Sequence, residues 1–120
     1  MKLSRNFSRY EFKCKCGQCD FDTVDVELVQ ILQDIRDIFG VVTITSGNRC
    51  AEYNRAIGGA VNSYHVRGRA ADIQVLGVEP SAIADYLENA YPDRLGIGRY
   101  NTFTHVDTRT GKGRWTHQTS

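Results

Sequence analysis

The sequence predicts an α+β fold in which helices pack on a small, antiparallel-rich sheet, and three observations carry this prediction. Apolar residues recur at the spacing of one helix face from about Val24 to Phe39. The β-branched run Val41–Thr45 is typical of a buried strand. The stretches LGIGRY, 95–100, and TFTHVD, 102–107, predict two further strands joined as a hairpin. Helices that precede a small sheet, with one more helix inserted, favour the α+β class.

The size and charge of the chain limit what kind of protein it can be. Its 120 residues are enough for one compact domain, 1–120, and too few for two ordinary ones. A hydrophobic share of 41% is sufficient for a core and argues against global disorder. The formal net charge of +1 gives no reason to expect a nucleic-acid partner, and no apolar run approaches the roughly 20 residues of a membrane-spanning helix. We expect a monomer that neither binds nucleic acid nor inserts into a membrane.

The N-terminal stretch MKLSRNFSRYEF lacks the apolar segment of a signal peptide. We therefore expect the chain to be made in the cytoplasm, and any action outside the membrane would follow release or delivery by another agent. Within this stretch, Ser8 and Glu11 match a capping box and predict one short helical turn. The cysteine-rich segment CKCGQC follows as a loop.

Capping residues set the expected ends of the next helices. Asp22 or Thr23 can cap the start of the long amphipathic helix, and Gly40 ends it. A short helix is expected over Glu52–Ile57, where the two glycines that follow end it. The long helix should pack on one face of the sheet.

The second half of the chain supplies most of the sheet. Ala70–Val75 predicts a strand, and Pro80 suits the first turn of a helix over about Ser81–Ala90. The tail GKGRWTHQTS is expected to be mostly loop, with His117 solvated rather than bound to a metal.

The four cysteines are unevenly placed: Cys14, Cys16 and Cys19 lie in CKCGQC, and Cys50 stands alone in SGNRC. Together they could hold a structural zinc, although the cluster includes only one of the common C-x2-C spacings. Two disulfides or buried free thiols are the alternatives. Without a secretion signal, stable disulfides are not the default.

Three side chains are candidate ligands for a catalytic zinc: His65, Asp72 and His105. Zinc in hydrolases takes three protein ligands and leaves one position for water. A loop-to-strand step of seven residues can bring His65 and Asp72 to one point, with small residues between them. In HVD, His105 and Asp107 point to the same face of a strand while Val106 faces the core. The alternative is an ordinary satisfied histidine and a turn-capping aspartate.

Two longer stretches carry a resemblance to a known family, TSGNRCAEYNRAIGGAVNSYHVRGRAADI at 45–73 and FTHVDTR at 103–109. The pattern S-x-H-x2-G-x-A-x-D, followed by H-x-D, falls on Ser63, His65, Gly68, Ala70, Asp72, His105 and Asp107. The chain resembles peptidase family M15, which comprises zinc D-Ala-D-Ala carboxypeptidases and phage L-alanyl-D-glutamate endopeptidases that cut peptidoglycan stems. The resemblance runs from FSRYEF to GRW and implies a small α+β fold shared with the hedgehog signalling domain.

The resemblance implies roles for individual residues. His65, Asp72 and His105 would bind Zn²⁺. Arg49 would hold a substrate carbonyl or carboxylate, for which a permanently charged, forked guanidinium is suited, and its alternative is a surface salt bridge. Ser63 would contact the substrate or only cap its loop.

The general base departs from the family pattern. Many members place an acid three residues before the last histidine, and here that position is Thr102, which cannot act as a base. Asp107 is the best substitute because it shares the face of His105, and it could instead orient His105.

The expected function is zinc-dependent hydrolysis of a peptide bond in peptidoglycan stem peptides, by a carboxypeptidase or an endopeptidase. Two alternatives remain open. A non-catalytic, zinc-containing cell-wall-binding domain is favoured by the missing acid. An interaction module built on the cysteine zinc would leave His65 dispensable.

Overall fold

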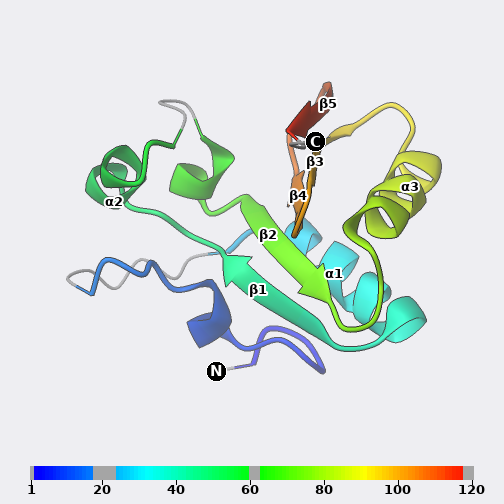
Figure 1. The fold of residues 1–120 in the computed structure, drawn as a ribbon. Coiled ribbons are helices and arrows are strands. Elements are labelled where there is room, and N and C mark those ends of the chain that lie inside the picture. The colour runs from blue at the N-terminus through cyan, green and yellow to red at the C-terminus, as the bar shows by residue number, and fades with distance from the viewer. Residues whose placement is uncertain (1, 18–23, 60–62, 118–120) are drawn as a thin grey trace.

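The computed structural model describes residues 2–17, 24–59 and 63–117 (Figure 1). Along the chain its elements are η1 (Arg9–Phe12), α1 (Val26–Phe39), β1 (Val42–Ser46), α2 (Ala51–Ala56), η2 (Tyr64–Arg67), β2 (Ala70–Val75), α3 (Pro80–Ala90), β3 (Leu95–Tyr100), β4 (Thr104–Asp107) and β5 (Lys112–His117). This order confirms the predicted α+β class. Within the ranges just given, no helix is both long and apolar enough to cross a membrane.

The five strands form one sheet in the order β1-β2-β4-β3-β5. The pairs β1–β2, β2–β4 and β3–β4 are antiparallel, whereas β3–β5 is parallel. The antiparallel-rich sheet and the β3–β4 hairpin are therefore as predicted. β1 and α2 are each displaced by one residue from the ranges that the sequence suggested.

The start of α1 corrects the prediction of its cap. The helix begins at Val26, and the carboxylate of Asp25 accepts a hydrogen bond from the backbone N–H of Leu28 at 3.3 Å. The predicted caps, Asp22 and Thr23, lie outside the described residues. At the other end the helix stops at glycine 40, as expected.

β5 corrects the prediction that the tail is mostly loop. Lys112–His117 pairs in parallel with β3, yet its side chains are exposed or half-buried and show no apolar alternation. Long-range hydrogen bonds help to hold this strand instead: the guanidinium of Arg114 donates to the carbonyl oxygens of Leu95 at 2.7 Å and Tyr91 at 2.8 Å. A strand held in this way leaves no periodic signal in the sequence.

The sheet has a face covered by helices and a face opposite them. In Figure 1, α1 lies behind the strands and α3 lies beside β3 and β4. The core between these helices and the sheet contains Leu28, Ile31, Leu32, Ile35, Ile73, Ile83, Leu87, Ile97 and Val106. Because side chains alternate along a strand, Ile73 and Val106 face this core while their neighbours Asp72 and His105 point to the opposite face. The candidate site residues therefore lie on the face away from α1 and α3.

Candidate active site

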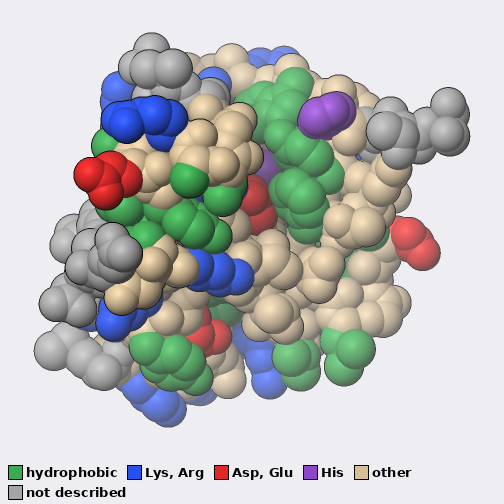
Figure 2. Space-filling view, turned by 60° about the vertical axis from the view of Figure 1, so that its left-hand side comes forward, with side chains coloured by type: hydrophobic (Ala, Val, Ile, Leu, Met, Phe, Trp, Pro, Cys, Tyr) green, Lys and Arg blue, Asp and Glu red, His purple; other side chains and the backbone are tan. Residues whose placement is uncertain are grey.

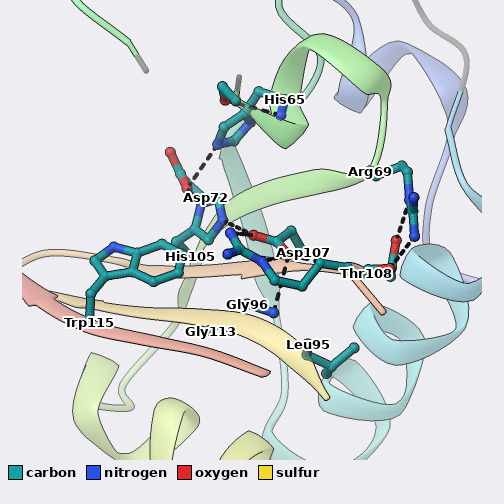
Figure 3. Close-up of polar contacts among 12 residues, drawn as sticks. His65, Arg69, Asp72, Leu95, Gly96, His105, Asp107, Thr108, Gly113 and Trp115 are labelled. Atoms are coloured by element: carbon teal, nitrogen blue, oxygen red, sulfur yellow. Dashed lines mark hydrogen bonds and ion pairs between the residues drawn. The ribbon is translucent and has the colours of Figure 1, made fainter. Parts of the chain in front are cut away.

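Three buried side chains that are far apart in sequence meet on this face (Figure 3). His65 comes from η2, Asp72 from β2 and His105 from β4, where Asp72 and His105 are direct partners in the strand pairing. One ligand atom from each of the three lies within 4.8 Å of the others. Each residue is at least nine-tenths buried. The sequence-based grouping is thus present in the fold.

Each imidazole has one nitrogen held by an oxygen and the other turned toward Asp72. His65 donates through Nδ1 to the carbonyl oxygen of Gly47 at 2.6 Å, and its Nε2 lies 3.2 Å from Asp72 Oδ1. His105 donates through Nε2 to Asp107 Oδ2 at 2.8 Å, and its Nδ1 lies 2.9 Å from Asp72 Oδ1. Metal-binding histidines show this arrangement, because an acceptor on one nitrogen fixes the tautomer and the ring direction.

The charges of the cluster favour a cation among these three residues. Burial raises the pKa of Asp72, but hydrogen bonds from His105 and His65 outweigh burial and hold that pKa well below its usual range. Burial lowers the pKa of His105, yet its hydrogen bonds to Asp107 and Asp72 raise the pKa overall. Two nitrogens and one carboxylate in a buried cluster that favours positive charge form a donor set that fits Zn²⁺.

Asp107 is fully buried and accepts hydrogen bonds at both of its oxygens. Oδ1 accepts from the backbone N–H of Gly96 at 3.1 Å and from Nε of Arg109 at 2.8 Å. Oδ2 accepts from Nη2 of Arg109 at 2.8 Å and from His105. Burial raises the pKa of Asp107, but Arg109 and His105 outweigh it and hold the pKa far below its ordinary value. These contacts favour the orienting role for Asp107 over the role of general base.

Arg109 has no role in the sequence-based predictions, and the structure makes it central to the site. Its guanidinium lies 4.7 Å from the ring centre of Tyr64 and 5.2 Å from that of Trp115, both within cation–π range. A Cβ atom at Gly113 would lie 2.7 Å from its Nη1. The only sequence signal was an arginine two residues after Asp107 in HVDTR.

Arg49 lies beside the cluster, as the resemblance implies. Its Nη2 is 3.4 Å from Asp72 Oδ2, and its other nitrogens donate to Ser46 Oγ and Asn54 Oδ1, each at 3.2 Å. The side chain is 13% exposed and lines the cleft described below, so it is not a surface ion pair. Ser63 lines the same cleft and accepts a hydrogen bond from the backbone N–H of His65 at 3.2 Å.

Thr102 and His117 stand apart from the His65–Asp72–His105 cluster. Thr102 lies in the turn before β4, where its carbonyl oxygen accepts a hydrogen bond from Gln74 at 2.9 Å, and it borders a different hollow. His117 is exposed at the end of β5, with its ring 5.6 Å from that of Tyr100.

The cluster forms the floor of an open cleft of about 770 Å³. Figure 2 shows acidic and histidine surface deep in a hollow beside a band of hydrophobic side chains. One wall is aromatic: the rings of Tyr100 and Phe103 stack at 4.3 Å, and Trp115 Nε1 donates to the hydroxyl of Tyr100 at 3.0 Å. Arg49 and Arg67 also line the cleft, so a bound chain would meet both apolar and cationic surface.

The cysteines form a second cluster outside this cleft. Ligand atoms of Cys14, Cys16 and Cys50 all lie within 4.8 Å of one another. None of these three forms a disulfide with another described cysteine, and Cys19 lies outside the described residues.

A small α+β domain with a buried His–Asp–His set under an open cleft has the arrangement of a metal-dependent hydrolase. Comparison with known proteins agrees, because the family model described as Peptidase M15 matches residues 5–107. The chain therefore belongs to the M15 peptidase family. It is similar to the "Probable peptidoglycan L,D-endopeptidase MepK" of Haemophilus influenzae, with 34% identity over an alignment 107 residues long, which covers 75% of this chain and 55% of the relative. The chain thus spans about half the length of that relative.

Proposed function

We propose that this protein is a zinc peptidase that cleaves a peptide bond inside the stem peptides of peptidoglycan. The observation that carries the proposal is the buried His65–Asp72–His105 cluster, whose donor atoms lie within 4.8 Å of one another at the floor of a cleft. Membership of the M15 family and the name of the Haemophilus influenzae relative support the substrate class and an endopeptidase activity.

Zinc would be held by His65 through Nε2, by the carboxylate of Asp72 and by His105 through Nδ1. When bound there, it would supply Lewis-acid chemistry, polarising a peptide carbonyl and lowering the pKa of water. The chain's part is to hold the donors in place before substrate arrives. The carbonyl oxygen of Gly47 fixes one imidazole and Asp107 fixes the other.

Arg49 would stabilise negative charge on the oxygen of the scissile carbonyl. Its guanidinium is already fixed by Ser46, Asn54 and Asp72, so little reorganisation is needed during the reaction. The same guanidinium could bind a terminal carboxylate, which keeps carboxypeptidase action as the second candidate.

Asp107 would act as a positioning residue in this scheme. Its oxygens accept from Arg109, Gly96 and His105, so taking a proton would disrupt a buried ion pair. The aromatic wall of Tyr100, Phe103 and Trp115 would pack against the bound substrate and exclude water.

Zinc content and product analysis test this function together. We would measure zinc per chain and peptide release from purified peptidoglycan for the wild type, His65→Ala and His117→Ala. His65→Ala should lose about one equivalent of zinc and all hydrolysis while remaining folded by circular dichroism. His117→Ala is the matched control, because His117 is exposed and lies outside the cluster, and it should retain both.

The masses of the released products decide the type of cleavage. A shortened internal fragment indicates an endopeptidase, and single D-alanine release indicates a carboxypeptidase. Equal zinc in the wild type and His65→Ala would contradict the proposal. Zinc and peptidoglycan binding without any product would favour the non-catalytic binding domain.

A further inference from the structure

The three described cysteines join two segments that are distant in sequence. Cys14 and Cys16 follow η1, whereas Cys50 caps the start of α2. Their sulfur atoms nevertheless lie within 4.8 Å of one another, and none of the three lines the cleft. We propose that Cys14, Cys16 and Cys50 form a second, structural zinc site that fastens the N-terminal segment to the segment carrying Gly47 and Arg49.

The spacing of the sulfurs fits a shared metal better than a disulfide. Thiolates bound to one tetrahedral zinc at about 2.3 Å lie about 3.8 Å apart, which is compatible with three sulfur atoms that all lie within 4.8 Å of one another. A disulfide would bring two sulfurs to about 2.0 Å and would not require a third sulfur beside them, whereas here all three lie together. Cys19 lies outside the described residues, and the three thiols converge without it.

Backbone N–H groups point at two of the three sulfurs. The N–H of Cys50 donates to Sγ of Cys14 at 3.3 Å, and the N–H of Tyr53 donates to Sγ of Cys50 at 3.4 Å. Hydrogen bonds of this kind are a common second layer around metal-bound sulfur. Cys14 is also 4% exposed, so three clustered thiolates would need a cation to offset their charge.

The joined segments run against each other next to the active site. The backbone N–H of Asn48 donates to the carbonyl oxygen of Phe12 at 2.8 Å, and a Cβ atom at Gly47 would lie 2.8 Å from the Cα of Phe12. On its other side, the same segment reaches the catalytic cluster: Gly47 accepts from His65, and the N–H of Arg49 donates to the carbonyl oxygen of His65 at 3.0 Å. The cysteine zinc would therefore hold Gly47 and Arg49 in register with His65, a consequence that rests on the proposed function.

Cobalt binding in a His65→Ala background tests the cysteine site by itself. The chain would be reduced, stripped of metal and titrated with Co²⁺ without oxygen, and the sulfur-to-cobalt charge-transfer absorption in the near ultraviolet would be followed. We expect saturation at about one Co²⁺ per chain and a tetrahedral thiolate spectrum. Cys16→Ser in the same background should remove that absorption. Cys16 is half-buried, so a serine there is expected to leave the fold intact.

Lys13→Ala is the matched control, because Lys13 lies in the same segment and bears no thiol; it should leave the absorption unchanged. Absence of the absorption in the His65→Ala protein would overturn the site. The site would also be overturned if the metal-loaded wild type had a mass two units below that of the reduced chain, because that difference indicates a disulfide. The two proposals fail separately. Equal zinc in the wild type and His65→Ala removes the catalytic site and leaves the cysteine site standing.

Discussion

The two clusters of metal-type ligands are built in contrasting ways. Asp72 and His105 face each other across paired strands, and both imidazoles are fixed by acceptors, Gly47 and Asp107. Cys14, Cys16 and Cys50 lie on loop ends whose connection is a few hydrogen bonds, including one from a backbone N–H to sulfur. A site set by strand register can keep its shape without a metal, whereas a site at loop ends depends on the metal for its order. The first arrangement suits catalysis and the second suits structural support.

Removal of bound metal should show the largest difference between the two clusters. With excess chelator, hydrolysis should disappear completely, and the midpoint of thermal unfolding should fall because both clusters lose their metal, with the larger part expected from the cysteine cluster. A structural site saturated at about 100 times its Kd contributes about 2.7 kcal/mol, so a fall on the order of 10 °C is expected. Calorimetry with and without chelator measures it.

The variants His65→Ala and Cys16→Ser divide that fall between the two clusters. The chelator should lower the midpoint of each variant by less than that of the wild type, and it should lower the midpoint of His65→Ala, which keeps the cysteine cluster, more than that of Cys16→Ser. An equal fall in both variants would show that the two clusters do not differ in this way.

The cluster of His65, Asp72 and His105 is called the strand-built cluster below. A steric clash next to it is expected to give the next largest effect on stability and activity. A Cβ atom at Gly96 would lie 2.3 Å from Asp107 Oδ2 and 2.5 Å from Arg109 Nε, and both groups are fixed by their ion pair. Gly96→Ala should therefore cost about 1 to 3 kcal/mol of unfolding free energy and lower activity. Urea denaturation measures the first quantity. Gly111→Ala is the control, since nothing lies within 4 Å of its added Cβ, and a loss as large as that of Gly96→Ala would contradict the steric account.

Short-range patterns predicted parts of the cluster of His65, Asp72 and His105, and the resemblance to the M15 family joined these parts into one site. His65 and Asp72 are seven residues apart on a loop and a strand, and HVD places His105 and Asp107 on one face. The same holds for α1, whose apolar spacing identifies its buried side. Residues that act within one element, or between two adjacent elements, leave a periodic signal.

Several other features that arise from the pairing of distant segments were not predicted. β5 was predicted as loop, because Lys112–His117 has no apolar alternation and is ordered by its pairing with β3. The carbonyl oxygen of Gly47, which orients His65, is a backbone atom that any residue would supply. Arg109 acquires its role only when Trp115 and Tyr64 come together around it. Such contacts depend on tertiary structure rather than on local propensity.

Asp107→Asn tests whether Asp107 positions His105 in the strand-built cluster. If Asp107 positions His105, loss of its charge should weaken zinc binding by about 10- to 100-fold, because the partners of metal-binding histidines contribute at that scale. If Asp107 is instead the general base, zinc affinity should hold and kcat should fall by about 10² to 10⁴. Competition with a zinc indicator, together with steady-state kinetics, distinguishes the two roles. Asp85→Asn, at an exposed ion pair with Arg99, should change neither quantity.

The smallest expected effect lies on the aromatic wall, where no metal ligand is involved. Phe103 stacks on Tyr100 at 4.3 Å, and both line the cleft. Aromatic pairs contribute about 0.5 to 1.5 kcal/mol beyond their buried area, so Phe103→Ala should raise KM about 2- to 10-fold. If the wall binds substrate and transition state equally, kcat will stay unchanged. Tyr10→Ala, at an aromatic side chain that is 75% exposed and outside the cleft, is the control for substrate kinetics. A fall in kcat equal to the fall in kcat/KM would instead mean that the wall acts in the transition state, and the cleft would then take part in the chemistry as well as in binding.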